Sequence, residues 1–387
     1  RFSGPRVVIC EGTGRRRRKT GRSALLFMIA LSAGSLATGQ SLRSIQLIHM
    51  IQNIQSGQAT PAPQPAYAWQ NDLRVDGHLA LNYSPDGAFS SGGSTLAVVG
   101  QRRVILLDLA NGRGLKALHP SIRGIEALDI QSASYVSPDR LFILANGLMK
   151  LKGQTSVTTP ELAFQWDIAQ DALSGKVEEI GVKGGFLPPV YLPRIHSVAL
   201  YKEGTFTLWN PVTALAQQYK LPQLTHPPHL FAFSPDGHWL LLAQIETNAN
   251  PNPIVVSAKQ HAFTDVLSGH HGTVLSMTFS RDGKLLETSC EDGKVRVWSV
   301  PDWKLISTLS GNSGPVHWAE FSPDGSLIAS AGEDNTARIW EVATGKLIRT
   351  FEESKQPLLT VAFSPDGKYL AATSENEVHV WVRKPTH

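Results

Sequence analysis

The chain has 387 residues, a hydrophobic content of 42% and a formal net charge of +4 at pH 7. This length suits one large β domain or two ordinary domains, with enough apolar residues for a sizeable core. Arg15 to Lys19 carry five positive charges, so the remainder is nearly neutral, which argues against a nucleic-acid-binding surface. The two cysteines, Cys10 and Cys290, are too few for a disulfide framework or a zinc cluster.

Residues 1 to 39 have the composition of an export signal. A basic segment, RRRRKTGR, precedes an apolar run from Ala24 to Ala37, and the small residues Ala37 and Gly39 have the spacing that a signal peptidase reads. The run is shorter than the roughly 20 residues that a spanning helix needs. We therefore expect an exported protein, periplasmic or secreted, with cleavage before Gln40.

Two alternatives remain for this region. Residues 24 to 37 could stay in place as a membrane anchor, or the whole segment could be upstream sequence that is not translated in the native protein. Because the chain begins with Arg1 rather than Met, residues 1 to 14 receive no native assignment.

Residues 40 to 66 are predicted to form a linker. SLRSIQLIHMIQNIQSG fits a short amphipathic helix, and the Pro-rich QATPAPQPA that follows is typical of an extended connection. The folded domain is predicted to span residues 67 to 387.

A five-residue pattern recurs through this domain. FSPDG begins at Phe233, Phe321 and Phe363, with the variants FSRDG at Phe279 and YSPDG at Tyr83. In such a pattern Pro sets φ at the first corner, Asp bonds back to the backbone, and Gly accepts a positive φ. Since each copy lies between two apolar runs, the pattern predicts repeated antiparallel hairpins.

The spacing of the turns gives the number of units. Ser280, Ser322 and Ser364 follow one another at 42 residues, Ser234 to Ser280 is 46, Ser84 to Ser137 is 53, and Ser137 to Ser234 is 97. The long gap holds two units, because HSVALYKEGTFTLWN at residues 196 to 210 predicts two strands joined by a Lys-Glu-Gly turn. The count is therefore seven.

The stretch from Leu267, LSGHHGTVLSMTFSRDGKLLETSCEDGKVRVWSV, resembles a complete repeat of the WD-repeat β-propeller family. It has Gly-His near the start, the hairpin turn, an Asp-Gly turn and a closing Trp. The next unit, LSGNSGPVHWAEFSPDGSLIASAGEDNTARIWEV, matches except that Asn312 replaces His, and PLLTVAFSPDGKYLAATSENEVHVWV keeps the turn and the Trp. The resemblance is strong over residues 228 to 382 and weak between residues 76 and 221.

The predicted fold class is all-β, a seven-bladed β-propeller of four-stranded antiparallel blades. Units of about 42 residues suit such blades, and each sheet buries both faces only when another sheet packs on either side. The chain ends just after Trp381, at the third strand of its last blade. We expect Trp69 to Val75 to supply the fourth strand, because an unpaired sheet edge promotes aggregation.

The resemblance implies a hydrogen-bonded structural set in each complete repeat. In this chain the matching residues are His270, Thr288, Asp292 and Trp298, followed by Ser330, Asp334, Trp340 and Trp381. His270, Asp292 and Thr288 are also residue types of a base, its orienting carboxylate and a nucleophile. The structural explanation accounts for all of them, so no catalytic residue is predicted.

No metal or cofactor site is predicted either. His226, His229, His270, His271 and His317 all lie near blade starts, but Pro227 and Pro228 stiffen the first pair and neighbouring strand residues point in opposite directions. The acidic residues form no pair at glycosidase separations, and the glycines lie in reverse turns rather than ahead of a helix.

The remaining candidates belong to loops. Two long polar loops, residues 146 to 160 and 246 to 253, are expected on the same face as the histidine-bearing loops, where a rigid scaffold places binding residues. The candidate partner-binding residues are Lys150, Lys152, Glu246, Asn248, His271 and His317.

The sequence thus predicts a non-enzymatic, monomeric propeller that binds a protein or peptide partner, with no nucleic acid and no membrane contact beyond an N-terminal anchor. The alternatives are an exported propeller enzyme, such as a hydrolase, lactonase or redox protein, and a cytoplasmic or nuclear scaffold if the N-terminal segment is not a signal.

Overall fold

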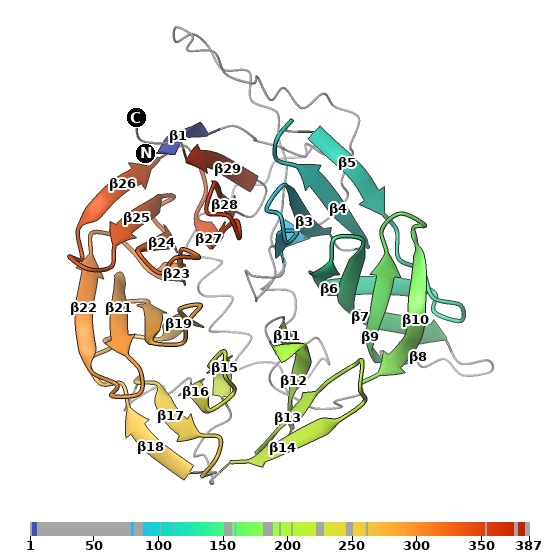
Figure 1. Ribbon diagram of the computed structural model, residues 1–387, viewed down its shortest axis with the longest axis horizontal. Coiled ribbons are helices and arrows are strands. Elements are labelled where there is room, and N and C mark those ends of the chain that lie inside the picture. Colours follow the sequence, from blue (N-terminus) through green and yellow to red (C-terminus); the bar gives the residue numbers. More distant parts are fainter. Residues whose placement is uncertain are drawn as a thin grey trace, which may run out of the picture.

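Seven β-sheets are arranged in a ring in the computed structural model (Figure 1). The structure describes residues 2–5, 79–80, 88–100, 102–111, 113–150, 157–158, 160–180, 189–192, 195–202, 204–221, 228–244, 251–260, 262–352, 354–374 and 378–383. We number the sheets as blades 1 to 7, in chain order from β2.

The first three blades cover the weakly matching part of the chain. Blade 1 contains β2 (Leu79–Ala80), β3 (Thr95–Gly100), β4 (Arg103–Asp108) and β5 (Arg113–Leu118). Blade 2 contains β6 (Ala127–Ser137), β7 (Arg140–Lys150), β9 (Glu161–Asp167) and β10 (Ala172–Glu179), with β8 (Val157–Thr158) paired to the end of β7. Blade 3 contains β11 (Val190–Leu192), β12 (Ser197–Lys202), β13 (Thr205–Trp209) and β14 (Ala216–Lys220).

The last four blades contain the strongly matching repeats. Blade 4 contains β15 (Pro228–Phe233), β16 (Trp239–Gln244), β17 (Ile254–Ser257) and β18 (Ala262–Val266). Blade 5 contains β19 (Val274–Phe279), β20 (Leu285–Cys290), β21 (Lys294–Ser299) and β22 (Leu305–Ser310). Blade 6 contains β23 (Val316–Phe321), β24 (Leu327–Gly332), β25 (Ala337–Glu341) and β26 (Leu347–Phe351). Blade 7 contains β27 (Leu358–Phe363), β28 (Tyr369–Ser374), β29 (Val378–Arg383) and β1 (Phe2–Pro5).

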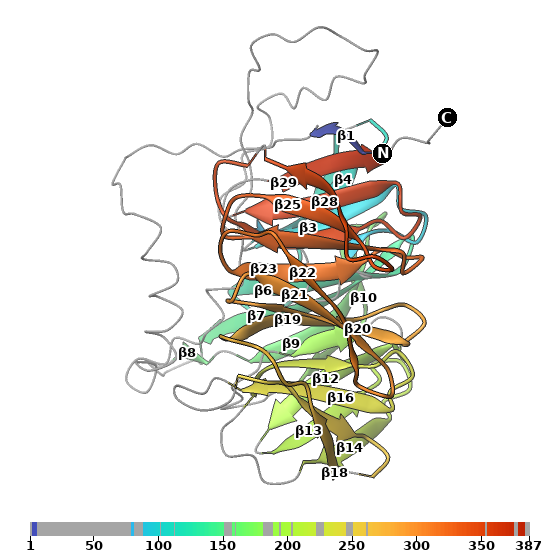
Figure 2. The same cartoon turned by 90° about the vertical axis from the view of Figure 1, so that its left-hand side faces the viewer.

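The predicted all-β, seven-bladed propeller of four-stranded antiparallel blades is confirmed. The gap between Ser137 and Ser234 contains the whole of blade 3, in which β12 and β13 form the hairpin expected from HSVALYKEGTFTLWN. Seen from the rim, the ring is a disc with the strand ends on its two faces, and β8 lies on one of them (Figure 2).

The recurring turn has the same geometry in blades 4 to 7. In each copy the Ser hydroxyl donates to the Asp carboxylate over 2.5 to 2.7 Å, in the pairs Ser234–Asp236, Ser280–Asp282, Ser322–Asp324 and Ser364–Asp366. The Gly that follows has φ between +68° and +72° in all four copies. The same local sequence pattern therefore forms the same hairpin turn in four blades.

The turn of blade 1 is not the one expected. YSPDG at Tyr83 was the predicted hairpin, but the same hydrogen bonds form around Ser90, whose backbone N–H donates to the carbonyl of Thr95 over 2.8 Å. Phe89 and Leu96 face each other across this turn. FSSGGS replaces FSPDG here because Gly93, with φ +69°, supplies the left-handed residue that the turn needs.

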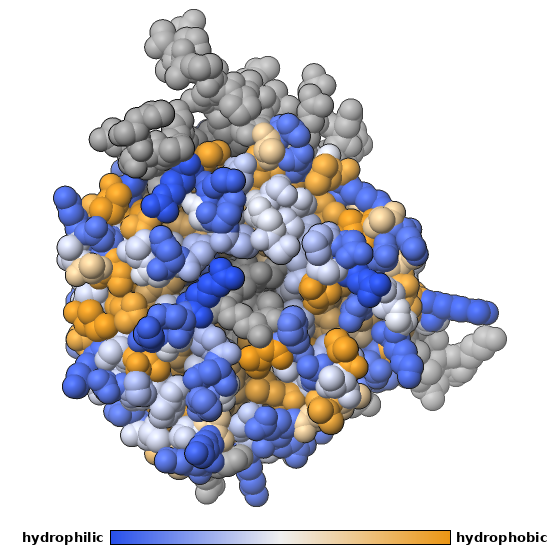
Figure 3. Space-filling view, in the orientation of Figure 1, coloured by the Kyte–Doolittle hydropathy of each residue, from blue (hydrophilic) through white to orange (hydrophobic). Residues whose placement is uncertain are grey.

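The hydrophobic core lies between blades rather than in one centre. Successive clusters join blades 4 and 5, blades 5 and 6, blades 6 and 7, and blades 7 and 1. Inner strands are buried on both faces, whereas the outermost strands expose apolar residues such as Leu305 and Ile306 of β22, which is visible at the left rim (Figure 3). Each sheet thus buries both of its apolar faces against neighbouring sheets, as expected for a closed ring.

The fourth strand of blade 7 is β1, which pairs antiparallel with β29 through Phe2 opposite Arg383 and Ser3 opposite Val382. The assignment of Trp69 to Val75 to this position was therefore wrong, and those residues lie outside the described part. A distant N-terminal segment does close the ring, as expected. The sequence could not identify which one, because an open edge bonds backbone groups that every extended segment offers.

Within the described residues, no helix is long and apolar enough to cross a membrane. The predicted signal or anchor and the linker, apart from Phe2–Pro5, lie outside the described part of the chain.

Candidate functional site

The antiparallel strand order places the connections of every blade on two faces. Turns between the first and second strands, and between the third and fourth, lie on one face. We call the opposite face, which carries the other connections, the loop face. In blades 5 and 6 it includes residues 267–273, 291–293, 311–315 and 333–336. This is the face on which the sequence predicted the histidines.

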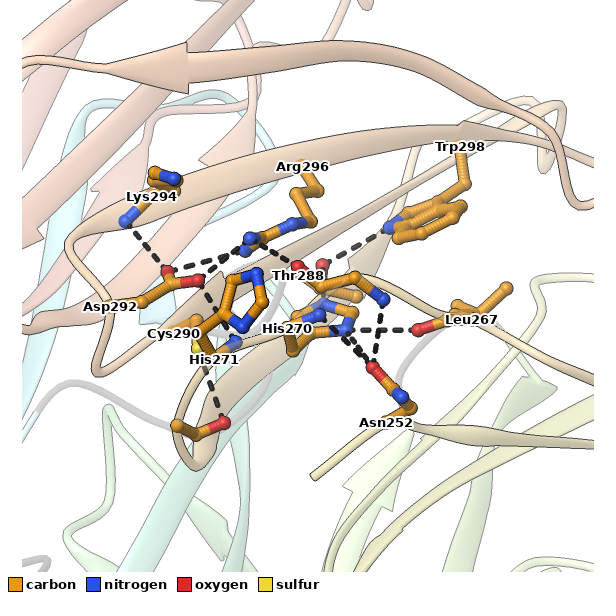
Figure 4. Close-up of polar contacts among 12 residues, drawn as sticks. Asn252, Leu267, His270, His271, Thr288, Cys290, Asp292, Lys294, Arg296 and Trp298 are labelled. Carbon is orange, nitrogen blue, oxygen red and sulfur yellow. Dashed lines mark hydrogen bonds and ion pairs between the residues drawn. The ribbon is translucent and has the colours of Figure 1, made fainter. Parts of the chain in front are cut away.

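Blade 5 contains a chain of hydrogen bonds that runs inward from the loop face (Figure 4). The indole N–H of Trp298 donates to Thr288 Oγ1 over 3.1 Å, and Thr288 Oγ1 lies 2.8 Å from His270 Nε2. The other ring nitrogen, Nδ1, lies 2.9 Å from the carbonyl oxygen of Leu267. The structure thus joins His270, Thr288 and Trp298, three of the four residues that the resemblance grouped.

Burial and the positive charge of Arg296 lower the pKa of His270 from 6.5 to about 4. The imidazole is therefore neutral near pH 7, with one nitrogen that donates and one that accepts. The network assigns the proton to Nδ1, which faces a carbonyl, so that Nε2 accepts from the hydroxyl of Thr288.

Asp292, the fourth residue of the predicted set, pairs instead with Arg296. Arg296 Nη2 lies 2.7 Å from Asp292 Oδ2, and both side chains are more than 90% buried. Arg296 also donates to the carbonyl of Gly269, and Asp292 accepts from the backbone N–H of His271. The ion pair therefore fastens the loop before β19 to the turn between β20 and β21.

Blade 6 repeats the ion pair but not the hydrogen-bond chain. Arg338 Nη1 lies 2.8 Å from Asp334 Oδ2, and Trp340 Nε1 donates to Ser330 Oγ over 3.0 Å. Asn312, in the place of His270, accepts from Arg338 over 2.6 Å. Its buried Nδ2 has no hydrogen-bond partner among the described residues.

Blade 7 keeps only the tryptophan of this set. Trp381 is 1% exposed and packs on Phe351, with the ring centroids 4.5 Å apart. Ala372 takes the place of Thr288 and Ser330, and the buried Trp381 Nε1 has no partner within the described part of the chain. From blade 5 to blade 7, the polar set thus becomes progressively smaller.

The set in blade 5 cannot reach a substrate in this arrangement. Thr288 is 0% exposed and His270 is 4% exposed, so a hydroxyl and base are present but closed off from solvent. Their contacts connect strands of one blade, which is the chemistry of stabilisation rather than of nucleophilic attack. In the described residues, no group of three or more His, Cys, Asp or Glu could hold a metal ion.

The structure describes three of the six candidate partner-binding residues, Lys150, His271 and His317. His271 is exposed on the loop face, whereas His317 is only 8% exposed and lies 2.7 Å from Glu333 Oε2. Lys150 is the last residue of β7, which pairs with β8, so part of the loop expected at residues 146 to 160 is strand. Lys152, Glu246 and Asn248 lie outside the described residues.

The sequence reasoning missed the two buried arginines, Arg296 and Arg338. A signal was present, because RVW and RIW place an arginine two residues before the closing tryptophan in both repeats. Because side chains alternate along a strand, the arginine and the tryptophan lie on the same face of the sheet. The arginine is also four residues after the aspartate of the turn.

The model of the WD domain, G-beta repeat, matches residues 262–299, 303–341 and 345–382. Each match starts with the outer strand of one blade and ends with the third strand of the next, so consecutive blades are linked by the chain itself. No curated protein matches the chain. Propellers of WD40 repeats are typical of interaction scaffolds. The chain is therefore a seven-bladed β-propeller in which residues 262–382 match WD40 repeats.

Proposed function

We propose that this protein is a non-enzymatic, monomeric scaffold that holds a protein or peptide partner on its loop face. The observation that supports this is the pair of buried ion pairs, Asp292–Arg296 and Asp334–Arg338, which fix adjacent loops while His271 stays exposed beside them. A surface that is already ordered loses less conformational entropy when a partner binds.

Charge reversal on one face tests the proposal. His271→Glu with Lys355→Glu changes two exposed residues of the loop face, whereas Arg281→Glu with Lys346→Glu changes two exposed residues of the opposite face. The full chain and both double variants are compared by proximity cross-linking in the host cell and quantitative mass spectrometry. We expect at least one cross-linked protein to be lost from the loop-face variant and retained by the other.

The same partners in equal amounts for all three proteins, or a loss confined to the opposite-face variant, would contradict this assignment. Equal melting temperatures of the two variants are the control for folding.

We also propose that the protein is exported, as supported by the basic run, the apolar run and the small residues before Gln40. Cleavage there removes Phe2–Pro5, so a cleaved protein and a ring closed by β1 cannot be the same molecule. Mass spectrometry of the native protein distinguishes them. Peptides that span Gly39 and Gln40 intact, recovered in quantity from a soluble cytoplasmic fraction, would reject export.

A further inference from the structure

One ionisable side chain lies inside the apolar contact between blades 5 and 6. Glu287, in β20, is 0% exposed. Counted from the hairpin turn, the same position holds Leu241 in blade 4, Ala329 in blade 6 and Ala371 in blade 7. Three neighbouring blades thus use an apolar residue where blade 5 has a carboxyl group.

The side chain of Glu287 faces blade 6. Glu287 lies directly opposite Val297 in the ladder of β20 and β21, and paired residues project to the same face of a sheet. Val297 belongs to the cluster that contains Ala319 and Ile328 of blade 6. The carboxyl group therefore lies where the two sheets pack together.

Hydrogen bonding at this position is incomplete. Thr278 Oγ1 donates to Glu287 Oε1 over 2.8 Å, but Oε2 is buried without a hydrogen-bond partner among the described residues. One row further along, Ser276 bonds to Ser289 over 2.8 Å and accepts from the backbone N–H of Ala319 in blade 6 over 3.0 Å. Polar side chains of β19 and β20 thus form two adjacent pairs at the interface, Ser276 with Ser289 and Thr278 with Glu287.

No positive charge on the strands packed around Glu287 compensates for it. β19 contains no ionisable residue. On β21, Lys294 and Arg296 alternate with Val295 and Val297 and therefore lie on the other face. On β23, Glu320 alternates with Ala319, which faces blade 5, and His317 is bonded to Glu333.

We propose that Glu287 is a proton-dependent lock between blades 5 and 6, closed when the carboxyl group is protonated and loosened when it ionises. A neutral carboxylic acid can remain in this apolar contact, whereas a buried carboxylate without a compensating positive charge cannot do so without a large cost. Burial raises the pKa of Glu287 well above 4.5, although hydrogen bonds from Thr278 and Ser276 oppose the shift.

The sign of the pH effect follows from this shift. The folded protein keeps the proton to a higher pH than the unfolded chain does. The stabilisation is therefore complete below about pH 4.5 and is lost as the pH rises toward the folded-state pKa. Within that window, the unfolding equilibrium constant should increase about tenfold per pH unit relative to a variant without the carboxyl group.

The test compares the full chain with Glu287→Gln by urea unfolding between pH 5.5 and pH 9. We expect the unfolding constant of the parent to rise with pH relative to that of the variant, by at most about tenfold per pH unit, until the pH passes the folded-state pKa of Glu287. Glu287→Leu, which copies Leu241, serves if the glutamine variant does not fold. If the ratio of the unfolding constants of the parent and the folded variant did not change with pH, the lock would be overturned.

Two further measurements separate this lock from a general pH effect. The infrared carbonyl stretch of a protonated carboxylic acid should be present at pH 5.5, the lowest pH of the series, in the parent and missing from Glu287→Gln. Hydrogen exchange at pH 8 should be faster in β20 and β23 of the parent than of the variant, with blade 2 unchanged. Absence of the infrared band, or equal exchange in all blades, would overturn the proposal.

Discussion

Blades 5 and 6 share a hairpin turn, a buried Asp–Arg pair and a buried tryptophan, yet they differ in how that tryptophan is hydrogen-bonded. In blade 5 the indole of Trp298 belongs to a chain that continues through Thr288 to His270, whereas in blade 6 the chain stops at Ser330 because Asn312 turns to Arg338. Both tryptophans remain almost fully buried. The comparison indicates that packing of the tryptophan between blades is the constant element and that the polar chain is a local addition.

Truncation of the tryptophans should have the largest effect. Trp298→Ala and Trp340→Ala should each reduce the free energy of unfolding by about 3 to 5 kcal/mol, because both leave a cavity between sheets. The measurement is denaturant unfolding, with Leu305→Ala on the exposed rim of blade 5 as the control. If Trp298→Ala cost much more than Trp340→Ala, the hydrogen-bond chain would matter more than the packing does.

Loss of the ion pair should come next. Asp292→Ala leaves Arg296 buried without its carboxylate and should cost about 3 kcal/mol. Because the charge left behind causes most of the loss, adding Arg296→Met should restore part of it. Asp302→Ala, an exposed aspartate in the same blade, should have little effect. A double variant no more stable than Asp292→Ala would contradict this account of the cost.

A hydrogen bond can also be added where the comparison shows one missing. Ala372→Ser in blade 7 places a hydroxyl where blade 6 has Ser330, within reach of the unpaired Nε1 of Trp381, and should increase stability by about 1 kcal/mol. Ala371→Ser is the matched control, because it puts the same group on the other face of β28, toward blade 1. Thermal unfolding of both variants measures the difference, and equal destabilisation by both would refute it.

The smallest effect should come from the hairpin turns. Burial acts to raise the pKa of Asp324 in blade 6, but hydrogen bonds from Ser322 and Ser326 outweigh it and hold the pKa below its ordinary value of 3.8. This contribution is present above about pH 4 and is lost as the pH falls through the lowered pKa. Asp324→Asn should therefore cost less than about 1 kcal/mol at pH 7, because the turn is exposed, and still less near pH 3.

Asp282→Asn makes the same change in the turn of blade 5 and should behave alike, since the hydroxyl of Ser280 lowers the pKa of Asp282 in the same way. Urea unfolding at the two pH values measures both. A penalty that grew toward pH 3 would contradict the sign of the effect.

Much of the fold could be predicted because short sequence patterns determine its hairpin turns. The Ser–Pro–Asp–Gly residues at Ser234, Ser322 and Ser364 form the same bonded turn. The spacing of such turns, with two units in the gap between Ser137 and Ser234, predicted seven units. In blade 1, Ser90 forms the turn before β3 in a different sequence, and the YSPDG copy at Tyr83 lies outside the described residues. A motif identifies a turn that uses it, but a turn with the same geometry can be built from other residues.

The candidate site was less predictable. His270, Thr288 and Trp298 were grouped from the resemblance together with Asp292. In the structure Asp292 pairs instead with Arg296, four residues further along the same hairpin, and the pair also binds Gly269 and His271 of the preceding loop. The difference between His271, which is exposed, and His317, which is buried beside Glu333, also arises from the packing of neighbouring strands. Residue types alone do not distinguish these environments.

The sequence by itself determined the β class, the hairpin turns and the number of blades, because turn chemistry and strand alternation act over a few residues. Only the tertiary structure decided which segment pairs with β29, that the Asp292–Arg296 pair holds the loop before β19, and that Glu287 lies between two sheets. Each of these depends on contacts between separate segments of the chain: β1 with β29, Gly269 and His271 with the ion pair, and blade 5 with blade 6.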